Sequence, residues 1–148
     1  IGPGSFTGLR IGLGFAKGLA YSHGLPIIPV PTFLSLAYSL KSSQPSSGMI
    51  LSHGTKVFYQ EFKWSKEIPS PLLPPAVFNI KTLQDEKEIA FQSNCEALLE
   101  PDRRIKKADL TSENIGCLAN LNFKNWLQDR PYQLVPDYIA NFNTNPIG

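Results

Sequence analysis

The residues that could do chemistry are concentrated in a glycine-rich segment at positions 1–24. Gly2, Gly4 and Gly8 are spaced G-x-G-x-x-x-G, one residue longer than the dinucleotide-binding fingerprint, and no Walker lysine–serine pair follows. A glycine loop before a helix can still turn N–H groups toward an anion, so phosphate binding stays open. Ser5 lies outside the G-x-S-x-G pattern of a nucleophilic serine. The spacing favours a packing role for the loop over a phosphate site.

The histidines and cysteines do not form a metal-binding pattern. A catalytic zinc site takes three protein ligands, usually with two close in sequence. His23 and His53 are far apart, and we expect His23 at a helix C-terminus and His53 in a turn. Cys95 and Cys117 also lack metal-ligand spacing, so we expect free thiols in a reducing compartment.

Two charged clusters remain. The acidic residues of Asp85–Glu88 are interrupted by Lys87, which favours a solvated surface. The basic residues of Arg103–Lys107 could contact RNA phosphates, since neutralising a phosphate needs only a well-placed cation. No aromatic residue is interleaved with them, so a solvated loop is the favoured interpretation. The net charge of +2 does not by itself indicate a nucleic-acid-binding protein.

Length and composition predict one domain that can have two lobes. The chain has 148 residues, of which 42% are hydrophobic and only 18% are charged. This low charge suggests that another molecule covers part of the surface. No apolar run is long enough to span a membrane. Because the chain lacks an initiator Met and begins one residue before a motif, we expect a fragment.

The glycine loop must be positioned by the helix that follows it. The apolar residues recur at helical spacing: Leu9, Ile11, Leu13, Phe15 and Leu19. Ser5 or Thr7 can cap the start of this helix, and Gly24 suits a left-handed residue just beyond its end.

Glycines inside this helix predict close packing against another backbone. Each costs about 1 kcal/mol relative to alanine, and a face without Cβ atoms gives a compensating close approach. Gly4, Gly8 and Gly12 share one face, Gly14 and Gly18 another, and two cations flank them. The predicted partner interface comprises Gly4, Gly8, Arg10, Ile11, Gly12, Phe15, Lys17 and Gly18.

The remaining elements alternate between helix and strand, which predicts the α/β class. We expect a strand at 25–30, a helix from a Pro31–Thr32 cap to near Lys41, a hairpin of 49–51 and 56–64, a proline-rich connector at 68–75, a polar helical turn or short helix at 81–87, a strand at 88–91, a helix capped by Thr111 or Ser112, and a final edge strand at 134–142.

The segment Gly2–Gly12, with Ala16–Ala20 after it, resembles the signature of the TsaB (YeaZ) family. Pro26–Val30 and Thr32 are similar to the family's next strand and helix start. The resemblance implies an actin-like ATPase (ribonuclease H-like) fold with an incomplete N-terminal lobe. Residues 1–41 would then be the remainder of that lobe, and residues 42–148 a second, smaller α/β lobe.

The chain departs from the family pattern further on. Lys56 replaces the acid of the family's Glu-Val-Tyr strand. Leu51 stands where the hairpin usually opens with an acid, and His53 where its turn has an arginine. Pro136–Ala140 resembles the closing Pro-x-Tyr-Leu-Arg, with Ala140 in place of the arginine.

The resemblance implies a non-catalytic scaffold subunit in the synthesis of threonylcarbamoyladenosine beside the tRNA anticodon. Its partners would be a TsaD-like catalytic subunit and a TsaE-like ATPase, with a homodimer as another assembly and tRNA met through the complex. The family implies no cofactor in this chain, since ATP and metal belong to the partners, and a cytoplasmic location without membrane contact. The alternative is an enzyme of the actin-like fold, either nucleotide-binding or a glycoprotease-like peptidase.

Overall fold

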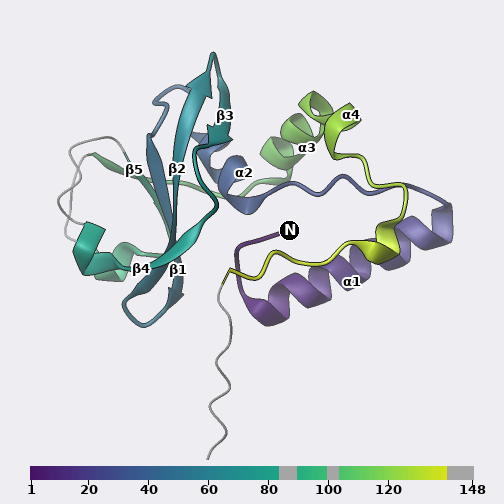
Figure 1. Ribbon diagram of the computed structural model, residues 1–148, viewed down its shortest axis with the longest axis horizontal. Helices are drawn as coiled ribbons and strands as arrows, with labels where there is room; N and C mark the ends of the chain where they lie inside the picture. Colours follow the sequence, from purple (N-terminus) through teal and green to yellow (C-terminus); the bar gives the residue numbers. More distant parts are fainter. Residues whose placement is uncertain (84–89, 100–103, 140–148) are drawn as a thin grey trace, which may run out of the picture.

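The structure, a computed structural model, describes residues 1–83, 90–99 and 104–139. A mixed sheet forms the packed part of the molecule together with α2 and α3, and α1 lies beside this part (Figure 1). The α-helices are α1 (Phe6–His23), α2 (Thr32–Ser39), α3 (Ser112–Leu121) and α4 (Phe123–Trp126). Short 3-10 turns are η1 (Ile80–Leu83), η2 (Glu96–Leu98) and η3 (Pro131–Gln133). Among the described residues, no helix is long and apolar enough to cross a bilayer.

Within the described residues the sheet has six strands, in the order β3-β2-β1-β5-β6 with β4 also paired to β2. The strands are β1 (Ser47–His53), β2 (Lys56–Ser65), β3 (Ile68–Pro71), β4 (Ala76–Asn79), β5 (Ala90–Ser93) and β6 (Ile105–Lys107). β1 and β2 form the predicted antiparallel hairpin, and β1, β5 and β6 run parallel. The predicted α/β class is therefore confirmed.

Alternation along the hairpin buries both faces of the sheet. Ile50 stands opposite Phe58, and both belong to the larger apolar cluster. Met49 and Val57 point to the other face and form the smaller cluster with Ile80. Successive strand residues face opposite sides, so the alternating pattern of the sequence assigns each residue to its cluster.

The larger core cluster joins α2 to the sheet. Phe33 of α2 lies 6.2 Å, centroid to centroid, from both Phe62 of β2 and Phe91 of β5. Leu118 of α3 belongs to the same cluster. Gly48 of β1 stands opposite Phe91, and the missing Cβ leaves room for this ring. This core anchors the hairpin next to the first turn of α1.

The predicted strand at 25–30 is wrong. Ile27 makes one isolated antiparallel bridge to Gln128, with a hydrogen bond in each direction. Val30 is buried beside α2 in the larger cluster. Leu25, at the other end of the stretch, is 58% exposed. The stretch 25–30 is therefore a connection that packs onto the core at Val30 and forms no ladder of hydrogen bonds with other described residues.

The proline-rich stretch is more than the predicted connector, because its first four residues form β3. Pro69 stands opposite Trp64, and Pro71 stands opposite Phe62. β3 is an edge strand, where the missing proline N–H does not interrupt a second ladder. The four prolines of residues 68–75 predict that the stretch is neither a regular helix nor a central strand, and this is confirmed. The interpretation of the whole stretch as a connector was wrong for Ile68–Pro71.

Other predicted bounds also differ. The second helix ends at Ser39 instead of near Lys41, and β5 occupies Ala90–Ser93 instead of 88–91. Residues 134–139 contain no strand, and the rest of that predicted strand lies outside the described residues. The predicted helical turn or short helix at 81–87 is described only to residue 83, and these residues belong to a 3-10 turn. The division into lobes at residue 41 stays a prediction.

Candidate protein-binding surface

Helix α1 begins at a capped loop and ends at a glycine, as predicted. Ser5 is the cap: its hydroxyl accepts a hydrogen bond of 3.3 Å from the Gly8 N–H. Gly24 follows the helix at φ 62°, a left-handed conformation that glycine adopts without strain. His23 lies in the last turn, where its Nδ1 is 3.0 Å from the Leu19 carbonyl oxygen.

One side of α1 is exposed along its length. Ile11, Phe15 and Leu19 are 68%, 70% and 49% exposed. A Cβ placed on Gly12 or Gly18 would meet no atom within 4 Å. Because residues three and four apart lie on the same side of a helix, these residues form one continuous surface. We call it the glycine face; it consists of Gly8, Ile11, Gly12, Phe15, Gly18 and Leu19.

The opposite side of α1 faces the rest of the chain but buries little. Leu9 and Leu13 are half-buried, and Ala20 is the only buried residue of this helix. The helical period of the sequence is confirmed, but the five apolar residues predicted as one stripe divide between two sides. The larger share of apolar surface on α1 is therefore exposed.

Residues 131–139, which we call the strap, run along α1 (Figure 1). Lys17 Nζ donates a hydrogen bond of 3.1 Å to the Tyr132 carbonyl oxygen. Arg10 Nε donates one of 2.9 Å to the Tyr138 hydroxyl. At 100° per residue, Arg10 and Lys17 lie across the helix from Phe15. Both cations therefore contact the strap and leave the glycine face free of charge.

The eight predicted interface residues are thus not all on one surface. Five of them lie on the glycine face: Gly8, Ile11, Gly12, Phe15 and Gly18. Gly4 precedes the helix, is half-buried, and a Cβ there would lie 3.7 Å from the Leu9 side chain. Leu19 is the face residue that the predicted set omitted. The role of the set as a partner interface stays a prediction.

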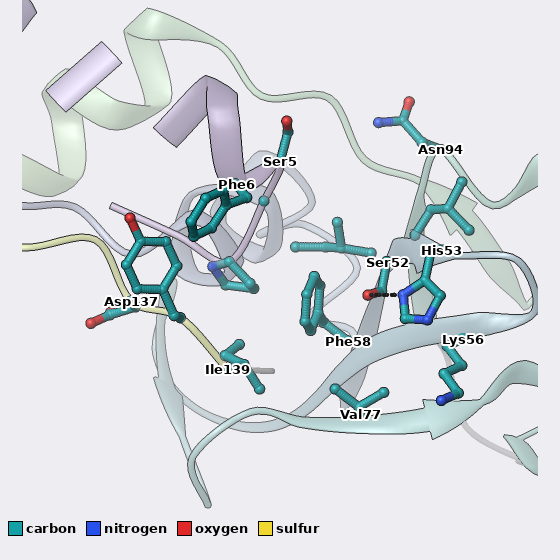
Figure 2. Close-up of a pocket in the computed structure, with 15 residues that line it drawn as sticks. Ser5, Phe6, Ser52, His53, Lys56, Phe58, Val77, Asn94, Asp137 and Ile139 are labelled. Atoms are coloured by element: carbon teal, nitrogen blue, oxygen red, sulfur yellow. Dashed lines mark hydrogen bonds between the residues drawn. The ribbon is translucent and has the colours of Figure 1, made fainter. Parts of the chain in front are cut away.

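A pocket of about 920 Å³ lies between the start of α1, the ends of β1 and β2, and the strap (Figure 2). Phe58, Val77 and Ile139 supply part of its apolar lining. His53 and Lys56 bring polar groups from the hairpin on one side, and Figure 2 places Asp137 of the strap on the other. Such a pocket can hold a small apolar group beside an anion.

The described polar groups of the pocket do not form a nucleophile–base–carboxylate triad. Ser52 Oγ lies 3.2 Å from His53 Nδ1, a contact between exposed sequence neighbours. A nucleophile–base pair needs a third group that orients the base, and Asp137, the only carboxylate among the described lining residues, is on the opposite side. Among the described residues, no three His, Cys, Asp or Glu side chains could hold a metal ion.

The two cysteines and the lysines of β6 differ in how far they are available to other molecules. Burial raises the pKa of the Cys95 thiol to about 11, whereas Cys117 is exposed, and both are free thiols as predicted. The predicted basic loop includes strand β6. Within β6, Lys106 Nζ donates to Ser43 Oγ at 2.7 Å, and Lys107 pairs with Glu96 at 3.1 Å. A hydrogen bond with Glu96 raises the pKa of Lys107. The acidic cluster at 85–88 lies outside the described residues.

Comparison with known proteins agrees with the resemblance seen in the sequence. The family model described as "TsaD: tRNA N6-adenosine threonylcarbamoyltransferase" matches residues 1–124. The tRNA threonylcarbamoyladenosine biosynthesis protein TsaB of Haemophilus influenzae is 53% identical over an alignment of 160 residues. The alignment covers 95% of this chain and 67% of that protein. The chain belongs to the TsaB (YeaZ) family. The Escherichia coli TsaB protein is 30% identical over 92 residues, 56% of this chain and 40% of that protein.

Solved structures show that the family's fold is shared. YeaZ from Pseudomonas aeruginosa superimposes with a TM-score of 0.72 at 20% identity, covering 93% of this chain and 71% of that one. A second structure is that of an uncharacterized protein with similarity to peptidase YEAZ from Pseudomonas aeruginosa. It superimposes with a TM-score of 0.73 at 19% identity, covering 94% of this chain and 70% of that one. The chain therefore has the TsaB-type α/β fold of the actin-like class, as predicted.

Proposed function

We propose that this chain is a non-catalytic TsaB-type subunit in the synthesis of threonylcarbamoyladenosine in tRNA. In this role it binds a TsaD-like catalytic subunit through the glycine face of α1. Family membership supports the pathway, because two TsaB relatives are named for it. The exposed state of the glycine face carries the proposal for the binding mode.

The glycine face has the properties of a helix-docking surface. Ile11 and Phe15 are more than two-thirds exposed on one helix, an arrangement that soluble monomers rarely keep without a partner. Gly12 presents open space beside them, so a second helix can approach closely. A large aromatic residue near the centre of an apolar patch is a common anchor of binding energy. Phe15 is the anchor we assign.

The partners follow from this assignment. A TsaD-like subunit supplies the catalysis, with its metal and ATP, and a TsaE-like ATPase joins the same complex. tRNA is reached through the complex, which operates in the cytoplasm. In the absence of the catalytic subunit, the same face pairs with a second copy of this chain. The family model described as TsaD matches residues 1–124, so this chain is itself similar to the proposed partner.

Substitutions on the glycine face test the binding mode. We expect Gly12→Leu to weaken binding to the cognate TsaD protein by overpacking, at a cost of about 1–3 kcal/mol, which corresponds to roughly 5- to 150-fold. Phe15→Ala should weaken it by at least 1 kcal/mol, about fivefold. Gly116→Leu is the matched control, since Gly116 lies in α3 and also faces open space. Equal affinities for all four proteins, measured by calorimetry, would refute docking through this face.

The pocket beside α1 is the observation that favours the alternative, a nucleotide-binding enzyme. It combines an apolar lining with Lys56 and the start of a helix, where anions are stabilised. Titration of the chain with ATP and magnesium decides between the two. We expect no saturable heat at millimolar nucleotide, and micromolar binding would replace the scaffold proposal with the enzymatic one.

A further inference from the structure

The strap connects α1 to the packed part of the molecule. A second connection lies before the helix, where the Gly2 N–H donates to Thr32 Oγ1 at 3.2 Å and the Thr32 N–H donates to the Gly2 carbonyl oxygen at 2.8 Å. Among the described helices and strands, η3 of the strap makes the most extensive contact with α1. The strap is itself held at its far end, where the Asp137 N–H donates to the Ile1 carbonyl oxygen at 2.9 Å. Because α1 fully buries only Ala20, apolar packing alone does not hold this helix against the core.

The N-terminal part of α1 is fastened to the strap by a cluster of Phe6, Arg10 and Tyr138. The Arg10 guanidinium carbon lies 3.8 Å from the centroid of the Phe6 ring and 5.7 Å from that of Tyr138. The two rings are 5.0 Å apart, and Arg10 Nε also donates to the Tyr138 hydroxyl. A planar guanidinium can stack and donate at the same time, which a lysine cannot do. Arg10 therefore joins both aromatic residues at once.

A second tie lies further along the helix, where Lys17 donates to the strap backbone. Both ties are across the helix from Phe15, so they leave the glycine face uncovered. A helix with Gly8, Gly12, Gly14 and Gly18 in its interior is intrinsically weak. Fixed ties from outside the helix are therefore needed to keep it formed and in one orientation.

We propose that the strap is a positioning element that holds α1 with its glycine face outward, and that Arg10 and Tyr138 are its positioning residues. They act through α1 and do not contact the partner. The effect on α1 itself is independent of what binds there. Only the consequence for partner binding rests on the proposed function.

Hydrogen exchange of the intact chain tests the positioning role. Tyr138→Phe removes one hydroxyl and keeps the ring. We expect it to accelerate amide exchange in α1 about three- to tenfold, while exchange in β1 and β2 is unchanged. This factor corresponds to the net free energy that one hydrogen bond contributes to stability. Tyr21→Phe is the matched control, because Tyr21 is 86% exposed on the same helix. Unchanged α1 exchange in Tyr138→Phe, or equal acceleration in the sheet, would overturn the proposal.

Affinity for the cognate TsaD protein separates the strap from the docking face. If both proposals hold, Tyr138→Phe and Phe15→Ala both weaken binding, and only Tyr138→Phe accelerates exchange in α1. Weaker binding by Phe15→Ala, with both affinity and α1 exchange unchanged in Tyr138→Phe, would refute positioning by the strap and leave docking intact. Accelerated exchange in Tyr138→Phe, with no effect of Phe15→Ala on affinity, would refute the docking face and leave the strap as the anchor of α1.

Discussion

Replacing Gly48 by alanine should destabilise the protein, although alanine usually stabilises a backbone position that glycine does not need. Gly48 of β1 stands opposite Phe91 of β5. An added Cβ would lie 2.1 Å from Phe91 Cζ and 2.3 Å from Cε1. Since carbon atoms pack at about 3.5–4.0 Å, the ring must move by roughly 1.5 Å to admit the methyl group.

The surroundings of the ring determine the size of the effect. Phe91 is fully buried, with Phe62 stacked at 5.8 Å and Phe33 tilted at 6.2 Å. The ring cannot move without displacing both neighbours, which places the penalty near the upper end of the range of about 1–3 kcal/mol for overpacking. Reduced entropy of the unfolded chain offsets about 0.4–1 kcal/mol. We expect a net loss of about 2 kcal/mol, or roughly 4–8 °C in Tm.

Urea unfolding followed by tryptophan fluorescence measures this loss. Gly116→Ala is the control with the opposite expected sign, because its Cβ meets no atom within 4 Å and alanine favours the helix by about 1 kcal/mol. Combining Gly48→Ala with Phe91→Leu should cost less than the sum of the two single changes, since the clash is then relieved. A Gly48→Ala protein that unfolds at or above the wild-type urea midpoint would refute this account of the core.

Two further predictions concern the thiols and the end of α1. Burial raises the pKa of Cys95 to about 11, so this thiol stays protonated at pH 8. A thiol reagent at that pH should modify the exposed Cys117 quickly and Cys95 only after unfolding. Rapid loss of both thiols in the native protein would contradict this. Gly24→Ala should destabilise the chain by roughly 1–2 kcal/mol in thermal unfolding, because φ at this position is 62°, and a Tm at or above that of the wild type would show that the left-handed cap is not needed.

The local pattern of the sequence predicted the elements whose ends carry their own signals. Ser5 and Gly24 cap α1 as expected, and Thr111 caps α3 by accepting from the Asn114 N–H. The hairpin was predictable because alternation assigns its residues to two faces. These features depend on residues close in sequence, so a single sequence contains the information for them.

The missed elements depend on what lies next to them in space. The apolar run at 25–30 resembles a buried strand, but a strand also needs a neighbour, and the described residues supply one bridge, at Ile27. β3 was missed because prolines are excluded only from central strands, and no local signal shows that Ile68–Pro71 lies at an edge. The stretch 134–139 is apolar enough for a strand but lies along α1 instead.

The candidate surface was predicted in part for the same reason. Glycine spacing predicted close packing against another backbone, within the chain or with a partner. No described atom of this chain lies within 4 Å of a Cβ placed on Gly12 or Gly18, so close packing with a partner stays a prediction. Periodicity shows which residues share a side of a helix, but not which side faces the chain. Arg10 and Lys17 were therefore grouped with the glycines, whereas they contact Tyr138 and the strap backbone. No sequence signal linked positions so far apart.

Reconstituted synthesis of threonylcarbamoyladenosine on tRNA tests the central claim most directly. The cognate TsaD protein and the other pathway proteins are held constant while this chain, wild type or Gly12→Leu, is titrated. A non-catalytic subunit that docks through the glycine face predicts the same maximal rate for both proteins, reached at about 5- to 150-fold higher concentration of Gly12→Leu. A lower maximal rate at an unchanged half-saturating concentration, or full synthesis without this chain, would contradict the claim.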